Sequence, residues 1–157
     1  MKQIRLAKLE FMTVFLSWSG TRSDEVAKVF AKWLKLMLQQ VEPWISSKDI
    51  ESGAMWDEEI QKKLENSYIG IVFLTIENKD KPWIHYEAGA LSKGIPSNRV
   101  MTFLVDLSTD DLLKTPLSKF NHTNDSDESL TKLLRTINKY LQPPLQKTSS
   151  MNYLTCI

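Results

Sequence analysis

The sequence predicts an α/β domain in which a parallel sheet is covered on both faces by helices. Two observations lead to this fold class. Short β-rich runs alternate along the chain with stretches of helical periodicity, and repeated strand-helix units of this length produce parallel sheets. One run, IGIVFLT at residues 69–75, is almost continuously apolar, as expected of a strand that is buried on both faces.

The composition fits a single globular domain. The chain has 157 residues, of which 42% are hydrophobic and 25% charged, and its formal net charge is +1. This length suits one domain with a core of ordinary size. The nearly balanced charge gives no reason to expect bulk attraction to nucleic acid or to a membrane surface, and no segment is long enough to span a bilayer.

The cysteine content and the N-terminal segment bear on the cellular compartment of the protein. Cys156 is the only cysteine, so no internal disulfide can form and a reducing cytoplasm is expected. The first twenty residues combine early positive charges with an apolar run, as a signal peptide does. We interpret the run as a buried strand, because Thr13 interrupts it and no small-x-small cleavage site follows.

The first half of the chain contains two expected strands. One covers Thr13–Ser17 and ends in the turn-like sequence SGTRS. The other covers residues 41–46, where Pro43 is tolerated best near the start of the strand or at an edge of the sheet. A helix begins between them near Ser23, with acidic residues in its first turn, where they suit the helix dipole. Its expected apolar stripe is Val26, Phe30, Trp33, Leu34 and Met37.

The second half continues the alternation. A helix with an apolar side formed by Trp56, Ile60 and Leu64 precedes the apolar strand at residues 69–75. Another helix follows, and then a strand is expected at residues 99–106 and a short strand near residues 116–121. The last helix is expected to end at Pro143 and Pro144. Its helically spaced apolar residues are Leu130, Leu133, Leu134, Ile137 and Leu141.

The helix in the segment KPWIHYEAGALSKG, residues 81–94, places its carboxylate in an unexpected position. If Pro82 is the first helical residue, Glu87 lies in the middle of an apolar arc, while His85 and Ser92 lie on the other side. A buried and unpaired carboxylate is costly, so a compensating role is expected. The apolar residues of the arc are Trp83, Ile84, Ala88, Ala90 and Leu91.

The fold class predicts where a ligand would bind. In sheets of this type, ligands bind beyond the carboxyl ends of the strands, which here selects the loops SWSG, SSKDIESGAMW and TIENKDKPWIHYE. These three loops should converge near Glu87. Several chemistries are excluded, because the chain has no GxGxxG, no GxxxxGK[ST] and no GxSxG. Two histidines and one distant cysteine give no metal-ligand spacing, so no metal is expected.

Three segments carry a family resemblance: VFLSWSG with the amphipathic helix after it, the loop SSKDIESGAMW, and above all PWIHYEAGALSK. Together they resemble a Toll/interleukin-1 receptor (TIR) domain of the type found in bacteria and archaea. The resemblance runs from Thr13 to Leu141 and implies a flavodoxin-like TIR fold with a central parallel sheet of about five strands. It divides the chain into a lead-in (1–12), a TIR domain (13–142) and a C-terminal tail (143–157).

The resemblance also implies an activity. In TIR domains that cleave NAD, a glutamate at the position of Glu87 is the catalytic residue, often with a tryptophan one turn before it, here Trp83. The chain would then be an NAD+ glycohydrolase that takes NAD+ as substrate, needs no further cofactor, and releases either ADP-ribose or a cyclic isomer of it. The residues expected to contact the substrate are Trp83, Ser17, Trp18, Ser19, Ser47 and Lys48.

The resemblance further implies assembly and a biological setting. TIR domains become active when they associate, with the loop after the second strand packing on a neighbour, and the assembly residues expected here are Asp49, Ile50 and Gly53. The implied partners are other copies of the domain and a separate sensor or effector protein, in prokaryotic antiviral defence or signalling. The second loop departs from receptor-type members, because Lys48-Asp49 and Ser52-Gly53 stand where those usually carry an Arg-Asp and a Pro-Gly pair.

Alternatives remain open at each residue and for the whole chain. Glu87 could cap a loop amide or pair with Lys48, Trp83 could belong to the core, and Ser17 and Ser19 could satisfy turn amides. The chain as a whole could be a catalytically silent TIR interaction module. It could also be a nucleoside deoxyribosyltransferase-like enzyme, which shares the fold class and uses a glutamate nucleophile.

Overall fold

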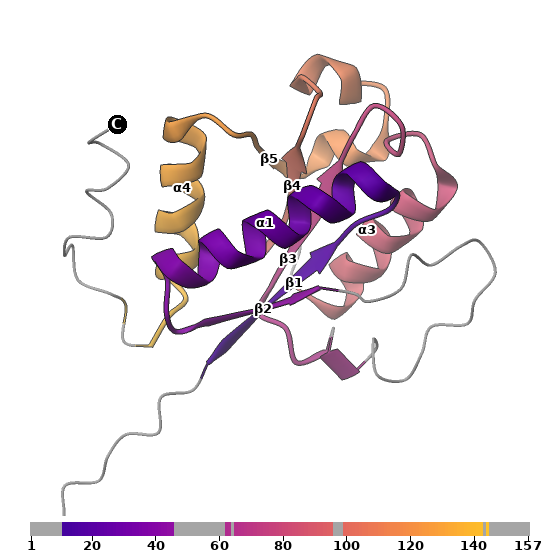
Figure 1. The fold of residues 1–157 in the computed structure, drawn as a ribbon. Coiled ribbons are helices and arrows are strands. Elements are labelled where there is room, and N and C mark those ends of the chain that lie inside the picture. The colour runs from indigo at the N-terminus through magenta and orange to yellow at the C-terminus, as the bar shows by residue number, and fades with distance from the viewer. Residues whose placement is uncertain (1–10, 46–61, 64, 96–98, 143, 145–157) are drawn as a thin grey trace, which may run out of the picture.

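A computed structural model describes residues 11–45, 62–63, 65–95, 99–142 and 144 of the chain (Figure 1). Strands and helices alternate along this part, as the sequence predicts. The elements in order are β1 (Met12–Ser17), α1 (Thr21–Met37), β2 (Val41–Ile45), β3 (Ile69–Leu74), α3 (Pro82–Gly94), β4 (Val100–Leu104), the 3-10 helices η2 (Thr109–Leu112) and η3 (Pro116–Lys119), β5 (Asn121–Thr123) and α4 (Asp127–Asn138).

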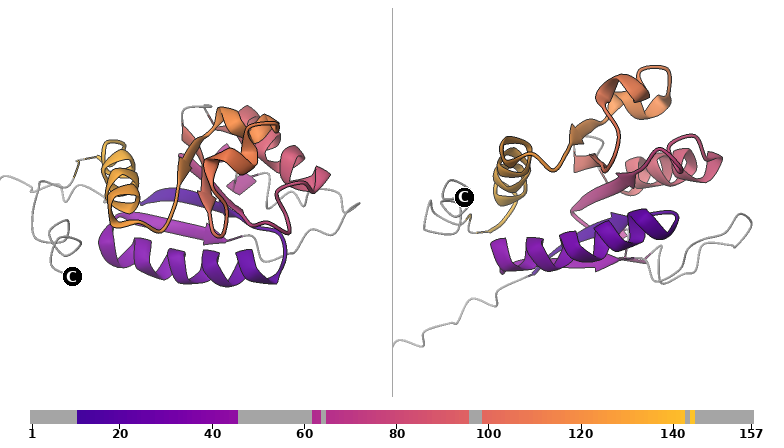
Figure 2. Two further views of the ribbon diagram at one scale, coloured as in Figure 1. Left: turned by 90° about the horizontal axis from the view of Figure 1, so that it is seen from above. Right: turned by 45° about the horizontal axis from the view of Figure 1, so that its top comes forward.

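The strands form one five-stranded sheet in the order β2-β1-β3-β4-β5, and every described pairing is parallel. Helices α1 and α4 lie on one face of this sheet and α3 lies on the other (Figures 1 and 2). The predicted α/β fold with a covered parallel sheet is therefore confirmed. Pro43 of β2 lies opposite Val14 of β1. Because β2 is an edge strand, the missing N–H of the proline is tolerated there.

The core on the α1 side is rich in aromatic residues. Phe30 of α1 contacts Phe73 of β3 and Phe103 of β4 in edge-on geometry, with ring centroids 5.3 and 5.4 Å apart. Leu34 of α1 and Ile137 of α4 are buried in the same cluster. The alternation of residues along β3 sends Ile69, Ile71 and Phe73 to this face, and the helices close over them.

The core on the other face fixes the position of α3. Ile84, Ala88 and Leu91 of this helix are buried against β3 and β4. The helix comes close to the sheet at Gly70 of β3, because a Cβ atom added there would lie 3.0 Å from Cδ2 of Leu91 and 3.3 Å from Cδ1 of Ile95. A side chain at position 70 would therefore displace the side chains of Leu91 and Ile95 that pack over it.

Two predictions made from the sequence are wrong in detail. The short strand expected near residues 116–121 is β5 at Asn121–Thr123, and Pro116 instead opens the 3-10 helix η3, since proline suits the first turn of a helix. The last helix ends at Asn138, well before Pro143, so the prolines do not stop it. Leu141 is buried just beyond the helix.

Other expectations fall partly outside the described residues. The helix predicted around Trp56 and Ile60 lies there, as do residues 1–10 and 145–157 of the expected lead-in and tail. Among the described helices, none has the length and the apolar character needed to cross a membrane.

Candidate active site

The loop from β1 to α1 is tightly hydrogen-bonded at the carboxyl edge of the sheet. The hydroxyl of Ser23 shares its single hydrogen between the carbonyl oxygens of Ser19 (2.7 Å) and Gly20 (3.0 Å), and its oxygen accepts from the backbone N–H of Ser19 (3.0 Å). Gly20 has a φ of 91°, a left-handed conformation that glycine adopts without strain. A serine of the first helical turn therefore pairs the N–H and C=O of Ser19 and the C=O of Gly20.

The predicted substrate residues of this loop are less exposed than binding residues usually are. Ser17 and Ser19 are buried, at 1% and 7% of their accessible surface. Trp18 is half-buried and packs against the core on the α1 side. The structure thus brings these three residues to the expected edge of the sheet, where their burial gives them a part in the packing of the loop.

The loop from β3 to α3 contains a residue that the sequence analysis missed. Asn78 is fully buried, and its side-chain nitrogen donates to the carbonyl oxygens of Ser19 (3.0 Å) and Phe73 (3.1 Å). Its side-chain oxygen accepts from the backbone N–H of Thr75 (2.8 Å). The first and third loops are therefore joined directly, as the convergence of strand ends predicts.

A second contact joins these loops to the end of β4. Asp106 accepts a hydrogen bond from the backbone N–H of Ile76 (2.8 Å) and forms an ion pair with Arg22 of α1. Arg22 is half exposed, so this pair contributes little by itself. The end of β4 was not among the predicted loops, but a carboxylate directly after a buried strand was a usable signal for this contact.

Helix α3 begins at Pro82 as predicted and buries the expected arc. Ile84, Ala88 and Leu91 are almost fully buried, whereas Ser92 is half exposed. By helical spacing, position 87 lies between Ile84, three residues earlier, and Leu91, four residues later. The side chains of Trp83 and Glu87 lie outside what the structure describes, so their contacts stay predictions.

His85 differs from the expectation of a plain surface residue. It is half-buried, and its Nδ1 atom is buried without a hydrogen-bond partner among the described residues. The predicted residues of the second loop, Ser47, Lys48, Asp49, Ile50 and Gly53, lie outside the described residues. No group of three or more His, Cys, Asp or Glu side chains suited to hold a metal occurs within the described part of the chain.

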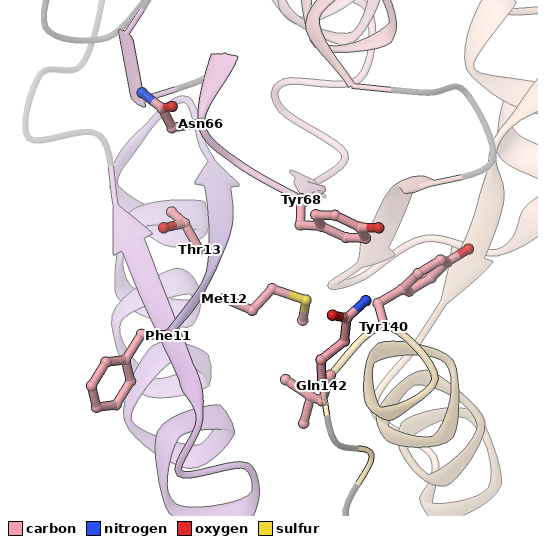
Figure 3. Close-up of a pocket in the computed structure, with 8 residues that line it drawn as sticks. Phe11, Met12, Thr13, Asn66, Tyr68, Tyr140 and Gln142 are labelled. Carbon is pink, nitrogen blue, oxygen red and sulfur yellow. The ribbon is translucent and has the colours of Figure 1, made fainter. Parts of the chain in front are cut away.

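A cavity of about 310 Å³ lies at the opposite, amino edge of the sheet (Figure 3). Its walls include Met12 and Gln142, whose side chains point toward each other, while Phe11 points away from them. Tyr68 and Tyr140 form the aromatic side of the cavity, and the guanidinium of Arg99 stacks 4.1 Å from the ring centre of Tyr68. This cavity lies at the edge of the sheet opposite the strand-end loops that join beside the start of α3.

The fold and the joined loops define a class: α/β domains whose ligand site lies at the carboxyl edge of a parallel sheet. A family model described as TIR domain matches residues 14–134, which is most of the chain. The chain therefore belongs to the TIR domain family, and the resemblance seen in the sequence is confirmed.

Solved structures agree with this family. The chain is similar to the TIR domains of the activated Roq1 resistosome directly recognizing the pathogen effector XopQ, with a TM-score of 0.51 and 14% sequence identity. The similarity covers 82% of this chain and 98% of that chain. At 14% sequence identity, this structural similarity establishes the fold alone. Among curated proteins, none matches the chain.

Proposed function

We propose that this TIR domain is an NAD+ nucleosidase that cleaves the bond between nicotinamide and ribose, with Glu87 as the catalytic residue. The observation that supports this proposal best is the environment of position 87. It lies on the side of α3 whose flanking residues, Ile84, Ala88 and Leu91, are buried, and the first and third loops join next to the start of this helix. A carboxylate at such a position carries a desolvation cost that a catalytic role would explain.

The chemistry of NAD+ explains why one carboxylate suffices. Glycosidases normally need a second carboxyl group as an acid, because their leaving group departs poorly. Nicotinamide carries a positive charge on its ring nitrogen while it is attached and leaves as a neutral molecule, so it needs no proton. The site has to stabilise the positive charge that develops on the ribose, and a partly desolvated carboxylate does this better than one in water.

The other predicted residues have supporting roles in this proposal. Trp83, one helical turn before Glu87, would stack on the nicotinamide or wall the pocket. Ser17, Trp18, Ser19, Ser47 and Lys48 would contact the ribose and the phosphates. The reaction would need no metal and no cofactor besides the substrate.

The proposal includes assembly. Activity would arise when copies of the domain associate through the second loop, with Asp49, Ile50 and Gly53 at the contact. The resistosome to which the fold is similar is named as an activated assembly of another TIR protein, which makes association a reasonable expectation here. A prokaryotic defence or signalling role in a reducing cytoplasm fits the family and the single Cys156.

Incubation of the purified protein with NAD+, followed by chromatography of the products, tests the activity. Nicotinamide together with ADP-ribose or a cyclic isomer is the expected result. Unchanged NAD+ over a range of protein concentrations would favour a silent interaction module. Base exchange on free nucleosides, with NAD+ left intact, would favour a deoxyribosyltransferase-like enzyme.

The variant Glu87→Gln tests the mechanism. We expect it to reduce the rate of NAD+ cleavage by at least about a hundredfold. The melting temperature should be unchanged or slightly higher, because a charge is lost from a desolvated position at nearly constant volume. Glu42→Gln is the matched control: Glu42 lies half exposed on edge strand β2 and pairs with Lys35 at the surface, so the control should retain full activity. Normal turnover by folded Glu87→Gln protein would contradict the mechanism.

A further inference from the structure

Asn78 uses all the hydrogen-bonding groups of its side chain inside the protein. The amide nitrogen donates to Ser19 O (3.0 Å) and to Phe73 O (3.1 Å), and the amide oxygen accepts from Thr75 N (2.8 Å). The bond to Ser19 spans 59 residues of sequence. Because the residue is fully buried, losing this set would take one donor from the Ser19 carbonyl and one from the Phe73 carbonyl at a place that water does not reach.

The backbone N–H and C=O of Ser19 are hydrogen-bonded to Ser23 and Asn78. The carbonyl oxygen of Ser19 accepts from Asn78 and also from Ser23 Oγ (2.7 Å), which occupies both lone pairs. Its N–H donates to Ser23 Oγ (3.0 Å). The Ser19 carbonyl therefore already has two donors inside the protein, so we expect a ligand at this loop to contact its side chains or other backbone groups.

Asn78 is also connected to the start of α3. Its carbonyl oxygen accepts from the N–H of Lys81, the residue that precedes the helix, at 3.0 Å. The Lys81 carbonyl in turn accepts from Ile84 N at 3.0 Å. One residue thus links the β1–α1 loop, through its side chain, to the helix that contains Glu87, through its backbone.

We propose that Asn78 is a positioning residue for the carboxyl-edge site: it fixes the Ser19 peptide and so sets where Ser17, Trp18 and Ser19 stand relative to α3. The inference rests on the proposed NAD+ cleavage. Asn78 acts through the loop and does not itself touch the substrate, since its side chain is fully buried and bonded to backbone groups of the protein. Small displacements of substrate-positioning groups have large effects on rate, which makes the proposal measurable.

Asn78→Asp is the sharpest test. The aspartate keeps the shape and one acceptor oxygen, but an ionised carboxylate cannot donate to Ser19 or Phe73, whereas a protonated one can donate to one of them. We expect kcat/KM for NAD+ to fall roughly ten- to a hundredfold at neutral pH, measured well below the melting temperatures of both proteins. The kcat/KM of the variant, divided by that of the parent, should rise as the pH falls from about 8 to about 5. Burial raises the pKa of a carboxyl group, so the aspartate gains a proton over this range and can donate again.

Hydrogen exchange gives a readout that does not depend on activity. The Ser19 amide should exchange about tenfold or more faster in Asn78→Asp than in the parent, because the loop opens more often, while the Leu16 amide within β1 should be little changed. Asn66→Asp is the matched control. Asn66 also loses one side-chain donor bond, to Lys62 O (2.7 Å), but it is exposed and lies before β3 at the opposite edge of the sheet, so both readouts should stay at parent values.

The outcomes separate the two proposals. A parent protein that cleaves NAD+, with an Asn78→Asp variant of equal kcat/KM, would overturn the positioning role and leave the activity standing. A parent protein that is inactive on NAD+ would contradict the proposed function. Hydrogen exchange would then decide the role of Asn78 by itself, and an unchanged Ser19 amide in Asn78→Asp would overturn it.

Discussion

At the scale of single residues, the buried polar side chains are concentrated at one end of the sheet. Most of those in the described part of the chain lie at or just after the carboxyl ends of β1 and β3, and they are Ser17, Ser19, Ser23, Thr75 and Asn78. Buried polar groups need partners, and here they find them in the bonds that join the first and third loops. The remaining ones, Ser67, Thr102 and Thr123, are dispersed.

His122 provides a prediction about pH. Its Nδ1 contacts Thr102 Oγ1 at 2.5 Å, and partial burial holds the pKa of His122 below its usual 6.5. Between the two values the unfolded chain binds more protons than the folded one, so stability should rise with pH across this window and fall as the pH drops below about 6.5. Urea unfolding between about pH 5 and 8 should show a shallower dependence in His122→Gln than in the parent.

The matched control for this prediction is Asn121→Ser. Asn121 is the exposed neighbour of His122 in β5 and does not titrate, so its replacement should leave the pH dependence of the parent unchanged. If His122→Gln unfolds with the same pH dependence as the parent, His122 does not contribute to it.

At the scale of elements, the placement of α3 depends on the absence of a side chain at Gly70 in the sheet beneath it. Gly70 leaves room for Leu91 and Ile95, so the helix lies close against β3. Because Glu87 belongs to this helix, the distance between α3 and the sheet also sets the distance between Glu87 and the strand-end loops. Packing on one face of the sheet is thereby coupled to the proposed chemistry.

Gly70→Val should lower the free energy of unfolding by about 1–3 kcal/mol and should also reduce NAD+ cleavage. The new side chain would overlap Leu91 and Ile95 and push α3 outward. Urea unfolding and the NAD+ assay measure the two effects. Gly89→Ala is the control within the same helix: a Cβ there meets none of the described residues within 4 Å, so stability should rise by about 0.5–1 kcal/mol. Equal stability of parent and Gly70→Val would show that the contact with α3 is loose.

At the scale of the whole molecule, the proposed function implies that activity depends on association. The specific activity on NAD+ should rise with protein concentration over a hundredfold range, about tenfold or more, as copies assemble. Ile50→Asp should flatten this rise without lowering the melting temperature, because it removes an apolar contact from the predicted assembly loop. The measurements are initial rates and light scattering at each concentration.

The matched control for assembly is Leu113→Asp. Leu113 is 68% exposed and follows η2, so this variant introduces the same charge at an apolar surface position outside the second loop in the sequence. Its concentration dependence should follow that of the parent. A specific activity that stays constant on dilution, in the parent and in Ile50→Asp alike, would show that a single copy contains a complete site.

Periodicity alone determined most of the architecture of this protein. The apolar run at residues 69–75 predicts β3, which ends one residue earlier, at Leu74, and the arc around Ile84 and Leu91 predicts the buried side of α3. These features are local: whether a side chain faces the core depends on the spacing of its near neighbours, which the sequence displays directly. The same spacing identifies position 87 as exceptional without the help of any family resemblance.

Only the tertiary structure decided the cross-connections. The bond from Asn78 to Ser19 and the pair of Arg22 with Asp106 span 59 and 84 residues, and no local pattern specifies such partners. The short strand β5 was misplaced for a related reason, since three residues give too little periodicity and the pairing of Asn121–Thr123 with β4 defines the strand. The sequence determines which faces are buried, whereas partners at the ends of strands are determined by which loops the folded sheet brings together.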